Sequence, residues 1–313
     1  MDGINMSEIP FTPFHPLKTP VLFLVFNRLD TTQQVFEAIR QAKPPRLYIA
    51  ADGARESKDG ESKKVQEVRE YILKHIDWGC EIKTLFREKN LGCKYAVSGA
   101  ITWFFEHEEM GIILEDDCLP SQSFFWFCEA LLERYQDDTR IGMISGDNFQ
   151  NGIKRGDADY YFSIYNHIWG WASWANRWEK YDVSLSGFEN AQFIDNLIKD
   201  NNTNKYWKNV FNQMKQQKVD TWDYQWTFTL WSQNQFTILP NVNLISNIGF
   251  GVDATHTTSD SEFSKLISYD LVLKNHPLHV EINKEADKFT AKLMFVQKTI
   301  FERIKYKIKR VFR

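Results

Sequence analysis

The sequence predicts an α/β protein built on a mostly parallel sheet with helices on both faces. Continuous apolar runs, such as residues 21–26 (VLFLVF), are typical of strands that are buried on both faces. Segments with apolar residues at helical spacing alternate with these runs through the first 150 residues. Strands and helices that alternate in this way indicate parallel βαβ units.

The expected elements follow in order from these two periods. Strands are expected at 21–26, 47–51, 81–86, 111–114 and 141–145. Helices are expected at 31–41, with Asp30 as N-cap, and at 61–75, 96–107 and 124–135. The less regular second half predicts helices at 189–199, 204–218 and 224–233, and short strands at 160–165, 236–239 and 243–245. The chain contains no internal repeat and no low-complexity linker, so we expect one continuous domain.

Composition excludes several classes of protein. The 313 residues carry 38 Lys and Arg against 41 Asp and Glu, a net charge of −3, which excludes a generic nucleic-acid coat. The four cysteines lack CxxC or zinc spacing, so we expect free thiols in a reducing compartment; they are Cys80, Cys93, Cys118 and Cys128. The N-terminal residues lack a signal-peptide pattern, and no apolar run approaches the ~20 residues of a membrane span. The expected location is therefore the cytoplasm.

The last stretch of the chain has a different character. Residues 298–313 (KTIFERIKYKIKRVFR) hold seven Lys and Arg against one acid, with apolar residues at helical spacing. This pattern predicts a basic amphipathic helix that binds the inner face of the membrane peripherally. The alternative is a C-terminal helix that docks its apolar stripe on the domain.

Polar side chains follow the expected strands at the edge where a parallel sheet binds its ligands. The residues at these positions are Asn27, Arg28, Asp52, Gly53, Glu115, Asp116, Asp117, Gly146, Asp147 and Asn148. The acidic triplet Glu115-Asp116-Asp117 is the sharpest element, because adjacent carboxylates at a buried strand end need a cation or hydrogen-bond donors. Strand alternation would place Glu115 and Asp117 on one side and Asp116 on the other. Oxygen ligands favour Mn²⁺ or Mg²⁺ bridging to a diphosphate; the alternative is a solvated acidic loop.

Two further segments are candidates for ligand binding. Asn90-Leu91-Gly92 opens an expected helix close to Lys94, a combination that can receive a phosphate. The alternative is an ordinary turn and cap. In the Trp-rich run 167–174, we expect His167, Trp169 and Trp171 to line a sugar or acceptor pocket. The alternative for this run is a buried aromatic core cluster.

Four of these segments resemble the A-type glycosyltransferase (GT-A) fold: VLFLVFNR, LYIAADG, NLGCKYAVSGAI and GIILEDDCLPSQSFFWFCEALLERY. The resemblance spans roughly residues 20–260. It is to the family around N-acetylglucosaminyltransferase I and to bacterial hemolysin-like nucleotide-diphospho-sugar transferases. It implies that Asp117 binds Mn²⁺, that Asp116 contacts the ribose, and that Glu115 faces the transferred sugar or the acceptor.

The same resemblance assigns the other strand-end residues. It implies that Asp52 contacts uracil, with Asn27 and Arg28 lining the same nucleotide pocket. From their own positions at the strand and helix ends, we also expect Gly53 and Lys94 on the nucleotide side and Asp147 on the sugar side. The chain then divides into an extension (1–19), a transferase domain (20–280) and the basic helical tail (281–313). Within the domain, residues 20–150 form the nucleotide-binding half and 151–280 the acceptor half.

Inverting transfer also needs a general base for the acceptor hydroxyl. Asp223 is the best candidate, as a first-turn carboxylate beside Trp222, a neighbour that would raise its pKa. Asp220 is its rival, and a plain N-cap is the structural alternative for Asp223. The loop 247–256, with two glycines flanking Phe250, is expected to close over the donor. The resemblance offers His256 in this loop as a metal or diphosphate ligand.

The sequence as a whole predicts a metal-dependent, inverting glycosyltransferase that uses Mn²⁺ or Mg²⁺ and a nucleotide-diphosphate sugar, with a UDP-sugar as the first choice. The expected acceptor is a glycan or a lipid-linked glycan, and no nucleic acid is involved. One alternative is a sugar nucleotidyltransferase, although VFNRLDTT lacks the glycine-rich basic loop such an enzyme carries. The other is a non-catalytic carbohydrate-binding protein.

Overall fold

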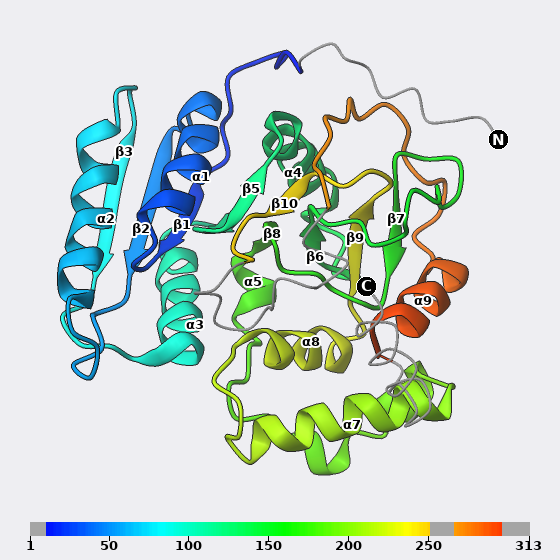
Figure 1. The fold of residues 1–313 in the computed structure, drawn as a ribbon. Helices are drawn as coiled ribbons and strands as arrows, with labels where there is room; N and C mark the ends of the chain where they lie inside the picture. Colours follow the sequence, from blue (N-terminus) through cyan, green and yellow to red (C-terminus); the bar gives the residue numbers. More distant parts are fainter. Residues whose placement is uncertain (1–10, 251–265, 296–313) are drawn as a thin grey trace, which may run out of the picture.

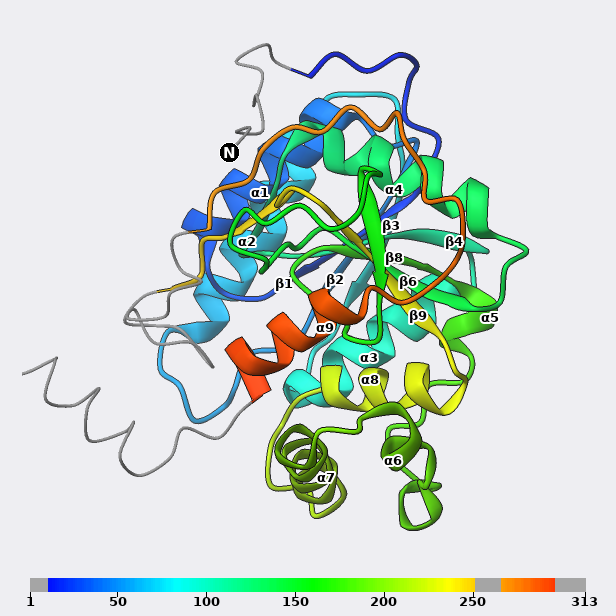
Figure 2. The same cartoon turned by 90° about the vertical axis from the view of Figure 1, so that its right-hand side faces the viewer.

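The computed structural model describes residues 11–250 and 266–295 (Figure 1). Within these ranges an eight-stranded sheet has the strand order β3-β2-β1-β4-β8-β6-β9-β7. A two-stranded antiparallel sheet of β10 and β5 lies beside it. Helices cover both faces of the large sheet (Figures 1 and 2), which confirms the expected fold class.

The first half of the chain forms four neighbouring parallel strands of the sheet. Its strands are β1 (Val21–Val25), β2 (Arg46–Ala51), β3 (Glu81–Phe86) and β4 (Met110–Glu115). Its helices are α1 (Leu29–Ala42), α2 (Glu61–His75), α3 (Gly92–Phe105) and α4 (Gln122–Tyr135). β1 pairs in parallel with β2 and β4, and β2 with β3, as the apolar runs predicted. The expected N-cap is wrong by two residues, because Arg28 occupies that position and Asp30 lies in the first turn of α1.

The second half extends the same sheet. Its strands are β6 (Ile141–Ser145), β7 (Tyr160–Ser163), β8 (Trp171–Trp174) and β9 (Phe236–Pro240), and the small sheet consists of β5 (Cys118–Pro120) and β10 (Ile245–Asn247). β8 runs antiparallel between β4 and β6, and β7 runs antiparallel beside β9. The sequence did not predict β5 or β8, because strands this short carry almost no periodic signal.

The helices of the second half are mostly shorter. They are α5 (Ala175–Trp178), a 3₁₀ turn (Phe188–Asn190), α6 (Phe193–Leu197), α7 (Asn201–Lys215), α8 (Asp223–Ser232), α9 (Lys284–Thr290) and a π-helical turn (Ala291–Phe295). The continuous helix expected over 189–199 is wrong. Ala191 leaves the helical region at φ −77° and ψ 55°, so the segment splits into the 3₁₀ turn and α6.

The two faces of the sheet bury separate cores, and this separation orients the candidate site. Side chains of α1, α2 and α4 pack on one face, and those of α3, α5 and α8 on the other. Ile112 and Leu114 of β4 point into the first core and Ile113 into the second. Because side chains alternate along a strand, Glu115 at the end of β4 lies on the face of α3 and α8.

Some predictions about the chain as a whole can be compared with the structure, and others concern residues that the structure does not describe. All four cysteines are free thiols, as expected. No helix within residues 11–250 and 266–295 is both long and apolar enough to cross a bilayer. Residues 298–313, Gly251 and His256 lie outside the described residues, so the proposed membrane helix and the late histidine ligand remain predictions.

Glu129 of α4 anchors the segment that leads into β1. Its Oε2 accepts hydrogen bonds from Lys18 N (2.7 Å), Thr19 N (2.8 Å) and Thr19 Oγ1 (2.8 Å), and the residue is 3% exposed. Replacing Glu129 by alanine leaves these buried donors without an acceptor, so we expect a loss of about 3 kcal/mol in the free energy of unfolding. Urea denaturation measures this loss. The matched control is Glu133→Ala on the exposed side of α4, and equal losses in both variants would contradict the anchoring role.

Candidate functional site

The acidic triplet meets an arginine from the neighbouring strand end. Arg28 follows β1, and its Nη2 contacts Asp116 Oδ1 at 2.6 Å and Asp117 Oδ2 at 2.8 Å. Both aspartates therefore converge on one nitrogen. The strand alternation expected across the triplet is wrong beyond Glu115, because β4 ends there and the chain turns at Asp116 and Asp117 before β5.

Burial and mutual repulsion change the proton affinities of these carboxyls. Burial, together with the charges of Asp117, Asp116 and Asp223, raises the pKa of Glu115 to about 8. Burial also raises the pKa of Asp116, to about 6, although the adjacent Arg28 opposes the change. Burial disfavours the Arg28 cation, but the two aspartates outweigh this effect and raise its pKa. The site thus combines a carboxyl at Glu115 that holds its proton more tightly than usual with an acid that is paired with arginine.

The carboxylate oxygens of the triplet are suitable ligands for a divalent cation that is held by few protein groups. Glu115 Oε1 and Asp116 Oδ2 are buried and accept no hydrogen bond from the described residues. No group of three or more His, Cys, Asp or Glu with metal-binding geometry occurs within those residues. Mn²⁺ and Mg²⁺ at diphosphate sites commonly use one or two carboxylates, the remaining ligands being phosphate and water. Asp117, with or without Asp116, fits such a site.

Asp223 comes toward the triplet from a different element, helix α8. It is the first residue of α8, and its Oδ1 accepts a hydrogen bond from Thr221 Oγ1. Its charge contributes to the raised pKa of Glu115, so the two carboxyls lie within electrostatic reach of each other. Trp222, the neighbour expected to raise the pKa of Asp223, belongs to the core. It is 1% exposed and stacks in the core on Trp171, with ring centroids 5.6 Å apart.

The residues predicted to bind the nucleotide hold the loops at this edge. Asp52 Oδ2 accepts hydrogen bonds from Leu91 N at 2.9 Å and Gly92 N at 3.1 Å. Asn27 Nδ2 donates to Glu61 Oε1 at 2.9 Å, and the Gly53 carbonyl accepts a hydrogen bond from Asn90 Nδ2 at 2.7 Å. Burial raises the pKa of Asp52 even though these amides stabilise its charge. All three residues lie at the ends of β1 and β2, but the groups named here already have protein partners.

The start of α3 binds carboxylates of the protein itself. Besides Asp52, Asp220 accepts hydrogen bonds from Cys93 N at 3.0 Å and Lys94 N at 2.9 Å. The expectation that these amides receive a phosphate is therefore wrong for this structure, because the acceptors come from within the chain. Lys94 itself is 7% exposed, with its Nζ 5.2 Å from the centre of the Tyr95 ring.

The Trp-rich run divides between the core and the site. Trp171 is fully buried in β8, so its assignment to a sugar pocket is wrong. Trp169 is half-buried and packs edge-on against Phe250, with centroids 5.8 Å apart. A side chain on the neighbouring Gly249 would clash with the Asp117 carboxylate, so the start of the predicted donor loop lies directly against the triplet. Trp169 therefore reaches the edge of the site through Phe250.

Asp147 is a buried hydrogen-bond acceptor for the backbone of the same Trp-rich run. It is fully buried, and its Oδ2 accepts a hydrogen bond from Trp169 N at 3.0 Å. Burial raises its pKa well above the ordinary value. Asp147 thus fixes the Trp169 backbone, and its full burial does not match the sugar contact that was expected.

His167 is also buried, at 6% exposure, and packs edge-on against Phe149 at 4.5 Å. Burial lowers the pKa of His167 to about 3. The unfolded chain then binds a proton that the folded chain does not, so this residue destabilises the fold as pH falls below the ordinary value of ~6.5. Relative to His167→Gln, the wild type should lose about 2 kcal/mol more stability between pH 6.5 and 5. Denaturation across this range tests the prediction; the exposed His107→Gln control should keep the wild-type slope.

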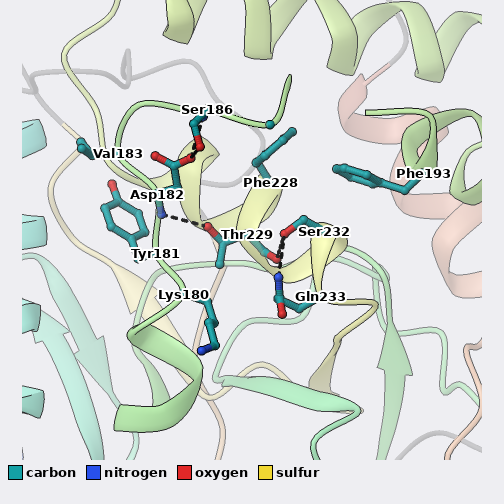
Figure 3. A pocket seen from close by; sticks show the side chains of 11 residues that line it. Lys180, Tyr181, Asp182, Val183, Ser186, Phe193, Phe228, Thr229, Ser232 and Gln233 are labelled. Carbon is teal, nitrogen blue, oxygen red and sulfur yellow. Dashed lines mark hydrogen bonds between the residues drawn. The ribbon is translucent and has the colours of Figure 1, made fainter. Parts of the chain in front are cut away.

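A cavity of about 500 Å³ lies along the later turns of α8 (Figure 3), and no residue of the triplet lines it. Aromatic and polar side chains line it together, among them Tyr181, Asp182, Phe193, Phe228 and Gln233. The amide of Asp182 donates to Thr229 Oγ1 at 3.4 Å, which joins the cavity wall to α8. The sequence did not predict this cavity, because its walls come from a loop and from two helices, α6 and α8, that show no shared motif.

Comparisons with known proteins show distant similarity of fold. No protein-family model matches the chain, and no curated protein matches it. Similar solved structures include GalNAc-T7 with UDP, GalNAc and Mn²⁺, at 12% identity and TM-score 0.42 over 72% of this chain and 43% of that one. Another is the glycosyltransferase GlyE of Streptococcus pneumoniae TIGR4, at 8% identity and TM-score 0.34 over 71% of this chain and 45% of that one.

A third is apo UDP-glucose pyrophosphorylase, at 10% identity and TM-score 0.33 over 70% of this chain and 90% of that one. The chain spans less than half the length of GalNAc-T7 and of GlyE. With identities this low, the activity has to be argued from the site itself.

Proposed function

We propose that this protein is an inverting glycosyltransferase. It would move a sugar from a nucleotide-diphosphate sugar, with a UDP-sugar as first choice, to a hydroxyl of a glycan or lipid-linked acceptor. The observation that carries the proposal is that Asp223 of α8 and the acidic triplet beyond β4 lie close enough for their charges to interact. Asp223 at the start of α8 lies within electrostatic reach of Glu115, while Asp116 and Asp117 gather on Arg28 in the next turn.

The two sides of this cluster suit different parts of the reaction. Asp223 would accept the proton of the acceptor hydroxyl as its oxygen bonds to the anomeric carbon and the bond from that carbon to the diphosphate breaks. Glu115, protonated near neutral pH, would donate a hydrogen bond to the sugar or the acceptor. Pairs of carboxyls whose environments separate their pKa values are typical of acid and base roles.

The other side would hold the leaving group. Asp117 would bind Mn²⁺ or Mg²⁺, which when bound supplies positive charge to the diphosphate. Arg28 offers a second cation at the same place, and Asp116 would face the ribose. Asn27, Asp52 and Gly53 shape the adjoining loops through their contacts with Glu61, Leu91 and Asn90.

Two observations favour this function over its alternatives. α1 begins at Leu29, directly after Arg28, so the chain has no room there for the basic glycine-rich loop of a nucleotidyltransferase. The aromatic residues that suggested a carbohydrate-binding protein are largely core, since Trp171, Trp222 and Trp226 are each at most 1% exposed. Residues 298–313 would bring the enzyme to an anionic membrane that carries a lipid-linked acceptor.

Calorimetry against UDP, GDP and CMP, each with and without Mn²⁺, tests the proposal. We expect one nucleotide to bind, at least ten times more tightly with the metal, and the corresponding sugar nucleotides to be turned over. A folded protein that binds none of them and releases no nucleotide from any sugar nucleotide would overturn the function. Glycan binding without nucleotide binding would instead favour a carbohydrate-binding protein.

A further inference from the structure

The segment before α8 is fixed to α3 at a point far away in the sequence. Asp220 accepts hydrogen bonds from Cys93 N through Oδ2 (3.0 Å) and from Lys94 N through Oδ1 (2.9 Å). Both oxygens of this carboxylate are therefore directed at the first turn of α3. Asp220 thus has the contacts of a helix cap supplied by a distant segment, three residues before the proposed base.

Gly92 permits this contact. Its backbone has φ +78°, and a Cβ at this position would lie 2.7 Å from Asp220 Oδ2. A glycine avoids both the strain of this conformation and the collision with the carboxylate. The close approach therefore depends on both residues, the carboxylate of Asp220 and the glycine at position 92.

The residues between Asp220 and Asp223 are held as well. Trp222 is 1% exposed and stacks on Trp171, with ring planes 22° apart. Its carbonyl accepts a hydrogen bond from the hydroxyl of Tyr181 at 3.1 Å. Tyr181 in turn stacks on Trp178 with centroids 4.3 Å apart, and Thr221 Oγ1 donates directly to the carboxylate of Asp223.

These contacts also link the two sides of the site. Asp52, at the end of β2, accepts from the amides of Leu91 and Gly92, and Asp220 accepts from the next two amides along the chain. The first turn of α3 is therefore a common fixed point for the strand edge and for the segment that carries Asp223. A base must sit within a fraction of an ångström of its working position, and support of this kind provides that accuracy.

We infer that Asp220 is a positioning residue that holds Asp223 in place for proton transfer, with Tyr181 as a second support, and that it is not itself the base. This inference rests on the proposed function, in which Asp223 is the base. It also explains why the rival aspartate lies so close in the sequence without taking that role. Its carboxylate oxygens are already engaged with Cys93 and Lys94.

The test is a double-mutant cycle on sugar-nucleotide turnover. Asp220→Ala should lower kcat by ~100-fold and leave the KM for the sugar nucleotide within twofold, because a displaced base slows the chemistry without touching the donor. Tyr181→Phe, which keeps the stacking on Trp178, should lower kcat by about tenfold. In the Asp223→Asn background, Asp220→Ala should have no further effect on the residual rate.

The matched control is Asp200→Ala. Asp200 also caps a helix, since it accepts from Thr203 N at 2.8 Å at the start of α7, but it has no contact with the Asp223 segment among the described hydrogen bonds. This variant should lower stability and keep the wild-type kcat. An Asp220→Ala enzyme with wild-type kcat would overturn the inference. So would a further loss on adding Asp220→Ala to Asp223→Asn.

Absence of turnover in the wild type would contradict the proposed function, and hydrogen exchange would then decide the positioning. The amides of Trp226 and Thr227 lie in the first turns of α8 and report on the placement of its start. Their exchange should be at least tenfold faster in Asp220→Ala than in Asp200→Ala. Equal rates in the two variants would overturn the positioning role.

Discussion

Replacing Asp223 by asparagine should lower kcat for sugar transfer by about 1,000-fold and leave nucleotide affinity within twofold. A general base contributes roughly 10²- to 10⁴-fold to a reaction of this kind, and the amide cannot accept the proton of the acceptor. Asparagine has the same shape, and its Oδ1 can still accept the hydrogen bond of Thr221. The loss should therefore be confined to the chemical step, which steady-state kinetics and calorimetry with the nucleotide separate.

The same substitution should change the proton affinity of its neighbour. The Asp223 charge is among the causes that raise the pKa of Glu115 to about 8, so Asp223→Asn should lower that pKa. Asp195→Asn is the control, because Asp195 is exposed and paired with Lys208 at 2.5 Å. If Asp223→Asn retained more than a third of the wild-type kcat, another group would be the base.

The strand-end residues were predictable because parallel strands have a strong local signature. β1 is buried at every position, and β4 ends at Glu115, one residue beyond the end of the expected strand at Leu114. The rule that ligands bind beyond the carboxyl ends of parallel strands then selects Arg28 and the triplet without knowledge of their contacts. Each strand end in this part of the site can therefore be recognised from a sequence pattern that spans only about 30 residues.

The contacts of those residues were not predictable, because their partners are distant in the sequence. Arg28 meets Asp116 across 88 residues, and Asp220 meets Cys93 across 127. A carboxylate that caps a distant helix has the same composition as one that binds a ligand. The sequence therefore identified Asp52 as a strand-end residue and Asp220 as a rival base, but it could not show that both carboxylates accept hydrogen bonds from the start of α3.

The aromatic residues presented the same ambiguity. A tryptophan ring packs equally well on a sugar or on another ring, and only burial decides between them. β8 is placed between β4 and β6 by long-range pairing, and this buries Trp171 and leaves Trp169 at the rim. A strand of four residues carries too little sequence signal to predict that placement. The predicted sugar pocket therefore included Trp171, which is part of the core.

Asp117→Ala should weaken Mn²⁺-dependent nucleotide binding by ~100-fold and abolish measurable transfer. Asp117 is the acid of the triplet best placed to hold a cation, because its side chain is 17% exposed while that of Asp116 is 6% exposed. Asp116 would remain paired with Arg28 through the 2.6 Å contact, so the fold around the strand ends should persist. Calorimetry with the selected nucleotide at several Mn²⁺ concentrations measures the effect directly, and Mn²⁺ paramagnetic resonance measures the metal without reference to activity.

Asp77→Ala is the matched control for this experiment, because Asp77 is likewise an aspartate paired with an arginine, Arg40, at 2.5 Å, but on the surface. It should leave metal-dependent binding unchanged. The two sides of the site also make opposite predictions, since Asp223→Asn should spare the nucleotide and Asp117→Ala should lose it. An Asp117→Ala protein that keeps wild-type Mn²⁺ dependence would place the metal elsewhere and leave Arg28 as the principal cation at the triplet.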